Sequence, residues 1–292
     1  MSIEIIKLIR LPQWIKNLFV FVPILFSKHL FVNYDFLYTL YGFFILCFSS
    51  SLIYVINDLI DIEADRAHPF KKNRPLASGK VSKSTAFILV AILVITIAAT
   101  LPFFDLKFAV TVLLFISLNV LYSFFLKHLV ILDIFSIAAG FSLRVLAGAF
   151  IINVEISSWL ILTTMFISLF LGVMKRHSEL NLVTENSSGV TRKVLSQYSI
   201  NFADQISTIA AAGVIICYAL YTVADRTILI FETEHLIYTT PFVVFGIFRY
   251  MYLVYLKDEG ENTTKIMLSD LPMIITVLLY IIITFNIIYF KL

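Results

Sequence analysis

The chain has 292 residues, of which 60% are hydrophobic and only 14% are charged, and its formal net charge is +3. Its mean hydropathy of +0.95 is far above what a soluble domain of this size needs to fill a core. This excludes a soluble globular protein and indicates an integral membrane protein. The two cysteines, Cys47 and Cys217, lie inside apolar runs, which argues against a disulfide framework.

The first segment, MSIEIIKLIRLPQWIKN (residues 1–17), is basic and amphipathic. It leads into LFVFVPILF without a small-residue cleavage site, so we predict a retained helix at the membrane interface rather than a signal peptide. Within it, Gln13, Lys16 and Asn17 are spaced to share one polar face of a helix. Lys16 could also simply reach outward to lipid headgroups.

Apolar runs long enough to cross a bilayer fill most of the remaining chain, since a spanning helix needs about 20 such residues. We therefore expect an all-α bundle of about nine transmembrane helices that forms a single transmembrane catalytic domain over residues 1–292. The expected spans are roughly 18–34, 36–56, 84–104, 107–125, 129–151, 157–174, 205–224, 236–256 and 270–290.

Positive charge selects the orientation of these spans, because an odd number places the two termini on opposite sides of the membrane. Most of the 22 lysine and arginine residues fall in the N-terminal arm and in the even-numbered loops, above all 57–83 and 175–204. Loops rich in these residues stay on the cytoplasmic side, so we expect both to be cytoplasmic active-site loops. The opposite side holds only Lys28, Lys107, Arg226 and Lys291.

The stretch NDLIDIEADRAHPFKKNRP follows the second span and begins with four oxygen-bearing side chains: Asn57, Asp58, Asp61 and Asp65. A helix would place the first, third and fourth on one stripe, with Asp58 beside it. Carboxylates stacked in this way repel one another unless a cation lies between them. Hard oxygen ligands that can share a cation with a substrate phosphate favour Mg²⁺. The pattern predicts a magnesium site, and the alternative is a solvated loop whose charges neutralise one another.

The second half of the same stretch is basic. Pro69 and Pro75 interrupt the helix and turn this segment back over the acidic residues, and His68 is a candidate residue of the resulting lid. Phosphate bridged by a metal and covered by Arg and Lys side chains is a typical polyanion site. The candidate cations are Arg66, Lys71, Lys72 and Arg74.

The signature NDLIDIEAD matches the pattern NDxxDxxxD and resembles that of the UbiA superfamily of intramembrane prenyltransferases. RLPQWIKNLFVFVPILFS upstream, DRAHPFKKNRPLASG, YSFFLKH and MKRHSEL extend the resemblance to the polyprenyl-phosphate phosphoribosyltransferase branch. The resemblance implies a nine-helix bundle whose polar cavity faces the cytoplasm. It also implies that Asp58, Asp61 and Asp65 are catalytic and that Mg²⁺ is the cofactor.

The loop after the sixth span departs from most members of that superfamily, which carry a second aspartate-rich motif there. This chain reads MKRHSELNLVTENSSGVTRK, with Lys175 and Arg176 in place of aspartates and Glu179 as the nearby acid. Cations are needed between like-charged groups that are brought close together. The exchange therefore favours two anionic substrates, 5-phosphoribosyl diphosphate (PRPP) and a polyprenyl phosphate.

Three further residues are candidates for substrate binding. Tyr122 and Lys127 lie near the cytoplasmic end of spans four and five, although Tyr122 could instead be an interfacial aromatic residue. Arg144 should lie deep in span five, where an arginine costs several kcal/mol unless it faces a wet cavity or a partner. It would therefore bind a substrate phosphate or pair with a buried acid.

These patterns predict an enzyme of the inner (cytoplasmic) membrane that transfers 5-phosphoribosyl from PRPP to a polyprenyl phosphate, with inversion at C1. Its expected partners are those two substrates and membrane lipid, with no nucleic acid, and an oligomer is possible. The main competing function is that of a prenyltransferase that acts on an aromatic or quinone-precursor acceptor. Two further classes compete with both enzymes: a transporter or lipid flippase that uses the acids as an ion site, and a purely structural membrane protein.

Overall fold

The computed structural model describes residues 2–67, 71–185, 193–257 and 269–290, and in this part of the chain all regular structure is helical. Eight helices there are long and apolar enough to cross a membrane. A shorter apolar segment, Leu11–Leu25, precedes them. The predicted all-α class and the count of about nine membrane-associated segments are confirmed, and the chain is a multi-pass membrane protein.

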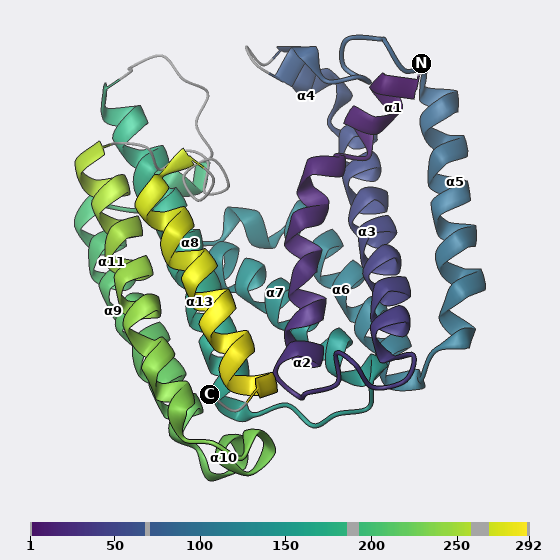
Figure 1. Ribbon diagram of the computed structural model, residues 1–292. Helices are drawn as coiled ribbons and strands as arrows, with labels where there is room; N and C mark the ends of the chain where they lie inside the picture. The colour runs from purple at the N-terminus through teal and green to yellow at the C-terminus, as the bar shows by residue number, and fades with distance from the viewer. Residues whose placement is uncertain (1, 68–70, 186–192, 258–268, 291–292) are drawn as a thin grey trace. The chain divides into compact units, whose positions relative to one another are not determined.

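The helices fall into two compact units, which Figure 1 colours along the chain. The first unit is packed around a core that includes Ile45, Phe108, Phe115 and Ala147. Its helices are α1 (Ser2–Leu8), η1 (Leu11–Phe21), α2 (Val22–Leu25), α3 (Asp35–Ile60), α4 (Ile62–Ala67), η2 (Lys71–Asn73), α5 (Lys83–Thr100), η3 (Leu101–Phe103), α6 (Leu106–Phe124) and the C-terminal part of α7 (Leu132–Ile151).

The second unit has its own core, which includes Phe170, Met174, Val214 and Tyr250. Helices α8 (Ser158–Glu185) and α9 (Ile200–Val223) pack closely because Gly213 leaves room for the ring of Phe166: a Cβ at Gly213 would come within 2.5 Å of the Phe166 Cδ1 atom. Besides the start of α7, the unit contains η4 (Leu126–His128), α8 (Ser158–Glu185), η5 (Lys193–Gln197), α9 (Ile200–Val223), α10 (Asp225–Phe231), η6 (His235–Thr239), α11 (Thr240–Lys257) and α13 (Leu271–Phe290).

The first apolar segment differs from its expected bounds. It begins at Leu11 rather than at residue 18, and its helix ends at Leu25. Arg10 adopts a left-handed backbone conformation (φ 54°, ψ 50°) and ends the short helix α1, and Pro12 lies in the first turn of η1, a position that tolerates its missing N–H group. The expected interfacial arm 1–17 is therefore two helices joined by a sharp turn.

The two loops expected to form the site are partly helical. Residues 57–60 belong to α3, and α4 follows before the described chain resumes at Lys71. In the second loop, α8 continues to Glu185 and η5 and the start of α9 follow. Residues 68–70 and 186–192 lie outside the described part, and with them His68.

Candidate functional site

The acidic stretch is divided between two helices. Helix α3 ends at Ile60, and Asp61 leaves the helical conformation (φ −89°, ψ 9°) before α4 begins. Backbone hydrogen bonds from the Asp61 N–H to the Asn57 carbonyl and from the Asp65 N–H to the Asp61 carbonyl, 2.9 and 2.8 Å, carry the chain through this break. The helix is therefore interrupted at Asp61, in the middle of the predicted stripe of Asn57, Asp61 and Asp65, although these two bonds keep the i, i+4 spacing across the interruption.

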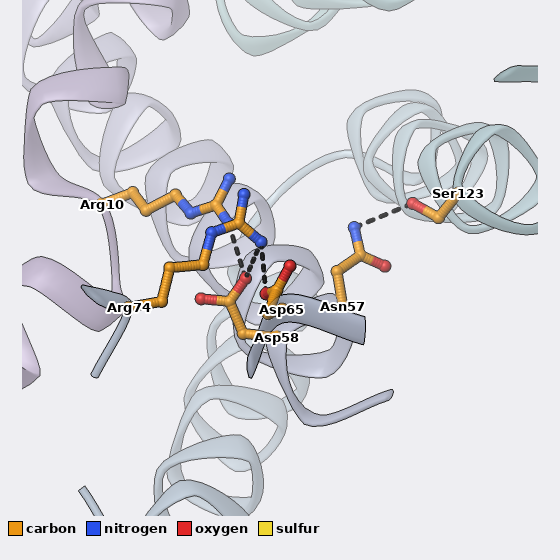
Figure 2. Close-up of polar contacts among 6 residues, drawn as sticks. All are labelled: Arg10, Asn57, Asp58, Asp65, Arg74 and Ser123. Atoms are coloured by element: carbon orange, nitrogen blue, oxygen red, sulfur yellow. Dashed lines mark hydrogen bonds and ion pairs between the residues drawn. The ribbon is translucent and has the colours of Figure 1, made fainter. Parts of the chain in front are cut away.

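Asp58, before the break, and Asp65, after it, lie close together and share a partner, as Figure 2 shows. Arg74 Nη1 donates to Asp65 Oδ2 at 2.7 Å and lies 3.2 Å from Asp58 Oδ1, so one guanidinium nitrogen bridges both carboxylates. Arg10 Nη2 donates to the same Asp58 oxygen at 2.6 Å. The two carboxylates are buried, with side-chain exposures of 3% and 4%, whereas Arg10 and Arg74 are 28% and 29% exposed.

The other two predicted ligands are placed differently. Asn57 is turned away from the carboxylate pair in Figure 2, and its Nδ2 donates to Ser123 Oγ on α6 at 2.9 Å. Asp61 is half-buried, and its carboxylate forms no ion pair with any residue that the structure describes. The centre of the site is therefore the pair Asp58 and Asp65.

The basic segment of the first unit reaches this pair through Arg74 alone among its described residues. Arg66 instead holds the segment in place, with Nε donating to the Ala77 carbonyl at 3.2 Å and Nη1 to Glu63 at 3.1 Å. Lys71 is exposed in η2. The lid predicted from the sequence thus contributes one guanidinium directly to the acids.

Arg10 is the site residue that the sequence analysis missed. Its guanidinium also lies over the Tyr54 ring, 4.6 Å from the centroid. The N-terminal arm is fixed to α3 by two hydrogen bonds at Ser51, one from Trp14 Nε1 at 3.0 Å and one to the Ile9 carbonyl at 2.9 Å. The sequence offered only that Arg10 is one of three cations in the basic N-terminal arm, with Lys7 and Lys16.

A second polar contact lies within the first unit, where Arg144 Nε donates to Asn17 Oδ1 at 2.7 Å. The guanidinium also lies over the Phe115 ring, 4.6 Å from the centroid. Asn17 is fully buried and its amide nitrogen also contacts Cys47 and Ser50. Both residues thus form an internal link between η1 and α7.

The remaining candidate substrate-binding residues of the first unit differ in how far their side chains are exposed to solvent. Gln13 and Tyr122 are half-buried, and Lys16 is exposed. The expected substrate contacts of these three residues stay predictions.

In the second unit, Arg176 lies in a buried network. Its Nε donates to Asp133 Oδ2 at 2.9 Å, its Nη1 donates to Glu179, and its side chain is only 2% exposed. Tyr198 donates to the other Asp133 oxygen and accepts from the Ile131 N–H, both at 2.8 Å. Burial chiefly raises the pKa of Tyr198, so its phenol remains a donor. The network fixes the end of α8 to the start of α7.

Two lysines of the second unit remain closer to solvent than Arg176. Lys175 is exposed on the last turns of α8, and Lys127 is half-buried in η4. The charge of Arg176 is balanced internally by Asp133 and Glu179, whereas Lys175 next to it in the chain is exposed.

The carboxylate pair fits a divalent cation. Two carboxylate oxygens from different helices converge on one cationic nitrogen of Arg74, so Asp58 and Asp65 are the side chains that would hold a divalent cation, which would neutralise their charge and that of a bound phosphate. Within the described ranges no three His, Cys, Asp or Glu side chains gather at one point. A metal here would need further oxygen ligands from amides, water or substrate. Mg²⁺ is typically bound in this way, by one or two carboxylates with water and substrate phosphate as the other ligands.

The described chain is thus a multi-pass helical membrane protein with a pair of buried carboxylates at the end of one span. The UbiA prenyltransferase family model matches residues 18–271, and the chain belongs to that family. This confirms the resemblance predicted from the signature.

Curated relatives agree with the narrower branch. The chain is 34% identical over 221 residues to a decaprenyl-phosphate phosphoribosyltransferase from Mycolicibacterium smegmatis, covering 74% of this chain and 69% of the relative. A protein of the same name from Mycobacterium tuberculosis H37Rv is 31% identical over 221 residues, covering 74% and 73%. The predicted classification as an enzyme of the phosphoribosyltransferase branch is confirmed.

Solved structures agree on the fold. A UbiA homologue from Archaeoglobus fulgidus, bound to GPP and Mg²⁺, superposes with a TM-score of 0.71 at 18% identity and covers 98% of this chain and 99% of its own. A structure described as that of digeranylgeranylglyceryl phosphate synthase gives 0.68 at 19% identity, covering 99% and 98%. At this identity the likeness establishes the shared helical bundle.

Proposed function

We propose that this protein transfers the 5-phosphoribosyl group from PRPP to a polyprenyl phosphate, giving polyprenylphosphoryl-5-phosphoribose and diphosphate. The observation that carries the proposal is the buried pair Asp58 and Asp65 with the two guanidinium groups of Arg10 and Arg74 upon it. Carboxylates that can hold a metal, beside arginines that can hold phosphate, suit a diphosphate leaving group. The names of the curated relatives support the phosphoribosyl donor.

In this proposal Asp58 and Asp65 hold the metal, with Asp61 and Asn57 as further oxygen donors. A bound Mg²⁺ would neutralise charge on the diphosphate as it leaves. Arg10 and Arg74 bind the diphosphate oxygens, and Arg66 keeps the basic segment in position through the Ala77 carbonyl. Lys71 and His68 remain candidate contacts of the same group.

The acceptor phosphate is assigned to the second unit. Lys127 and Lys175 bind its anionic oxygens, while Arg176, with Glu179 beside it, holds the end of α8 through Asp133. The buried ion pair does not release Arg176, because separating it would leave an uncompensated buried charge. Cationic side chains in place of a second carboxylate pair suit an acceptor that is itself an anion.

The bond changes need no general base. The C1–O bond to diphosphate breaks, with the electron pair leaving on the diphosphate, and a phosphate oxygen of the lipid forms the new C1–O bond. That oxygen is already ionised at neutral pH, and attack opposite the leaving group inverts C1. Arg10 and Arg74 stabilise the negative charge that develops on the departing diphosphate. The active site opens to the cytoplasm, where the charge bias of the loops places it.

The direct test supplies purified protein with Mg²⁺, labelled PRPP and a panel of polyprenyl phosphates, and detects labelled lipid by chromatography. The expected result is a labelled lipid phosphate that forms only when PRPP, acceptor and divalent cation are all present. NMR of the product should show inversion at C1. Absence of labelled lipid with every acceptor contradicts the proposal.

A second candidate is a prenyltransferase that uses a prenyl diphosphate, because the Archaeoglobus fulgidus homologue of the same fold binds GPP. The same diphosphate site would serve, and the acceptor would be an aromatic or quinone-precursor molecule. Incubation with labelled prenyl diphosphate and an aromatic acid separates the two: prenylated acceptor without labelled ribosyl lipid favours this second function.

A further inference from the structure

We propose that Arg10 and Arg74 are internal counter-cations that occupy the metal-binding carboxylates until a metal–diphosphate complex arrives, and that they then exchange onto the diphosphate. The inference deepens the proposed function and rests on its metal–diphosphate site. It predicts that a divalent cation alone binds poorly, and that cation and diphosphate bind in a strongly coupled manner.

The first step of the argument is the occupancy of the carboxylates. Asp58 Oδ1 receives both Arg10 Nη2 at 2.6 Å and Arg74 Nη1 at 3.2 Å, and Asp65 Oδ2 receives Arg74 Nη1 at 2.7 Å. Figure 2 shows the two guanidinium groups side by side over the acids. The oxygens that a metal needs are already hydrogen-bonded to cations, so a metal must displace those bonds to enter.

The second step is the balance of charge. The two buried carboxylates and the two guanidinium groups are neutral together. A divalent cation that entered alone would leave an excess of positive charge beside two buried carboxylates, where the cation and the two guanidinium groups repel one another. A diphosphate that enters with the metal brings several negative charges and gives both arginines a new bidentate partner.

The third step is that these arginines can move. Their side chains are 28% and 29% exposed, and Arg74 belongs to a short segment next to η2 rather than to a spanning helix. Arg176 differs, since it is 2% exposed and paired with a fully buried Asp133. Arg10 and Arg74 are partly exposed to solvent and can therefore change partner, whereas Arg176 is enclosed together with Asp133 and cannot.

The test measures Mn²⁺ binding to the full-length protein in detergent by electron paramagnetic resonance of the free ion, with and without inorganic diphosphate, and protein-free samples give the Mn²⁺ that diphosphate binds by itself. Wild-type protein should bind Mn²⁺ at least about tenfold more tightly when diphosphate is present, the size expected for charged hydrogen bonds gained and lost. Arg74→Gln should tighten binding of Mn²⁺ alone by about tenfold and weaken the dependence on diphosphate.

Lys80→Gln is the matched control, because Lys80 is an exposed lysine on the same connection between α4 and α5, is not one of the candidate phosphate-binding cations, and its loss removes the same charge. It should leave Mn²⁺ affinity within about twofold of wild type, since exposed charges are screened. If it tightens binding as much as Arg74→Gln does, general electrostatics explain the effect and the proposal is wrong. Equal wild-type affinity with and without diphosphate also overturns it.

Arg10→Gln provides a second variant that keeps Arg74 between the two acids, in case Arg74→Gln does not fold. It should also tighten binding of Mn²⁺ alone, and unchanged affinity in this folded variant contradicts the proposal. Replacing inorganic diphosphate with PRPP and with a prenyl diphosphate separates this inference from the proposed function. Coupling with the prenyl diphosphate but not with PRPP supports the exchange and rejects the phosphoribosyl donor.

Discussion

Asp58 is buried, lies close to a second carboxylate and is at the end of a membrane span. Removing its hydration without compensation would be costly, and the two arginines supply that compensation through charge-assisted hydrogen bonds. The same geometry explains why Asp65, seven residues further on, belongs to the site. The chain places the two acids on separate helices that meet at Asp61.

Asp58→Asn should reduce turnover by about a hundredfold or more, because it removes a negative oxygen from the proposed metal site and leaves Arg10 without its partner. Turnover is measured as labelled lipid formed from PRPP. Glu63→Gln is the control, since its side chain is 78% exposed and contacts only Arg66 among the described residues. Comparable losses in both variants would show that the assay reports general charge and not the site.

Asp133→Ala should lower the thermal unfolding midpoint strongly. Asp133 is fully buried and Arg176 is 2% exposed, so the variant leaves a buried guanidinium with a weaker partner, a change that costs about 3–5 kcal/mol. Glu179→Gln is the comparison, because this partner of Arg176 is 22% exposed and its loss is softened by water. Equal midpoints for the two variants would contradict a structural role for the buried pair.

At the scale of helices, the length of the apolar runs was sufficient to predict most of the membrane-spanning helices. The apolar runs predicted the spans because each needs about 20 residues to cross the membrane, and polar residues bound them on both sides. Asp61 could not be foreseen as a helix end, since no Pro or Gly marks it. Arg10 was missed because its partner lies 48 positions away, a distance that helical spacing does not report.

Gly148→Ala should destabilise the first unit by about 1–3 kcal/mol, the usual cost of overpacking. A Cβ at Gly148 would lie 2.0 Å from the Val20 carbonyl oxygen, a backbone atom that cannot rotate away. Gly246→Ala on α11 is the matched control, because, apart from its chain neighbours and the adjoining backbone of its own helix, no described residue has an atom within 4 Å of the added Cβ. It should keep or slightly raise the unfolding midpoint, and a drop equal to that of Gly148→Ala would contradict close packing at Val20 as the cause.

At the scale of the whole molecule, the charge distribution and the family signature could be predicted from the sequence. Which cations are exposed and which are buried in ion pairs could not. Lys175 and Arg176 are adjacent in the chain, yet one is exposed and the other is buried against Asp133. Which of two neighbouring cations is neutralised depends on contacts with Asp133 and Tyr198, and a single helix pattern does not contain them. The charge count therefore predicted a basic loop but not its ligand-facing residues.

Orientation in the membrane is the remaining property of the whole chain that the charge pattern predicts. Lys80 precedes α5 and Lys107 follows it, so the two exposed lysines flank one membrane-spanning helix and lie on opposite sides. The positive-inside tendency places Lys80 in the cytoplasm. Both native cysteines are buried, which keeps the background of thiol labelling low.

Lys80→Cys and Lys107→Cys should therefore give opposite labelling with a membrane-impermeant maleimide. In intact cells the reagent should modify Lys107→Cys alone, and in inside-out vesicles it should modify Lys80→Cys alone. Both sites should react in detergent, which controls for intrinsic thiol accessibility. Labelling of Lys80→Cys in intact cells would reverse the orientation and would put the carboxylate pair, which lies at the end of α3 that leads toward Lys80, out of reach of cytosolic PRPP.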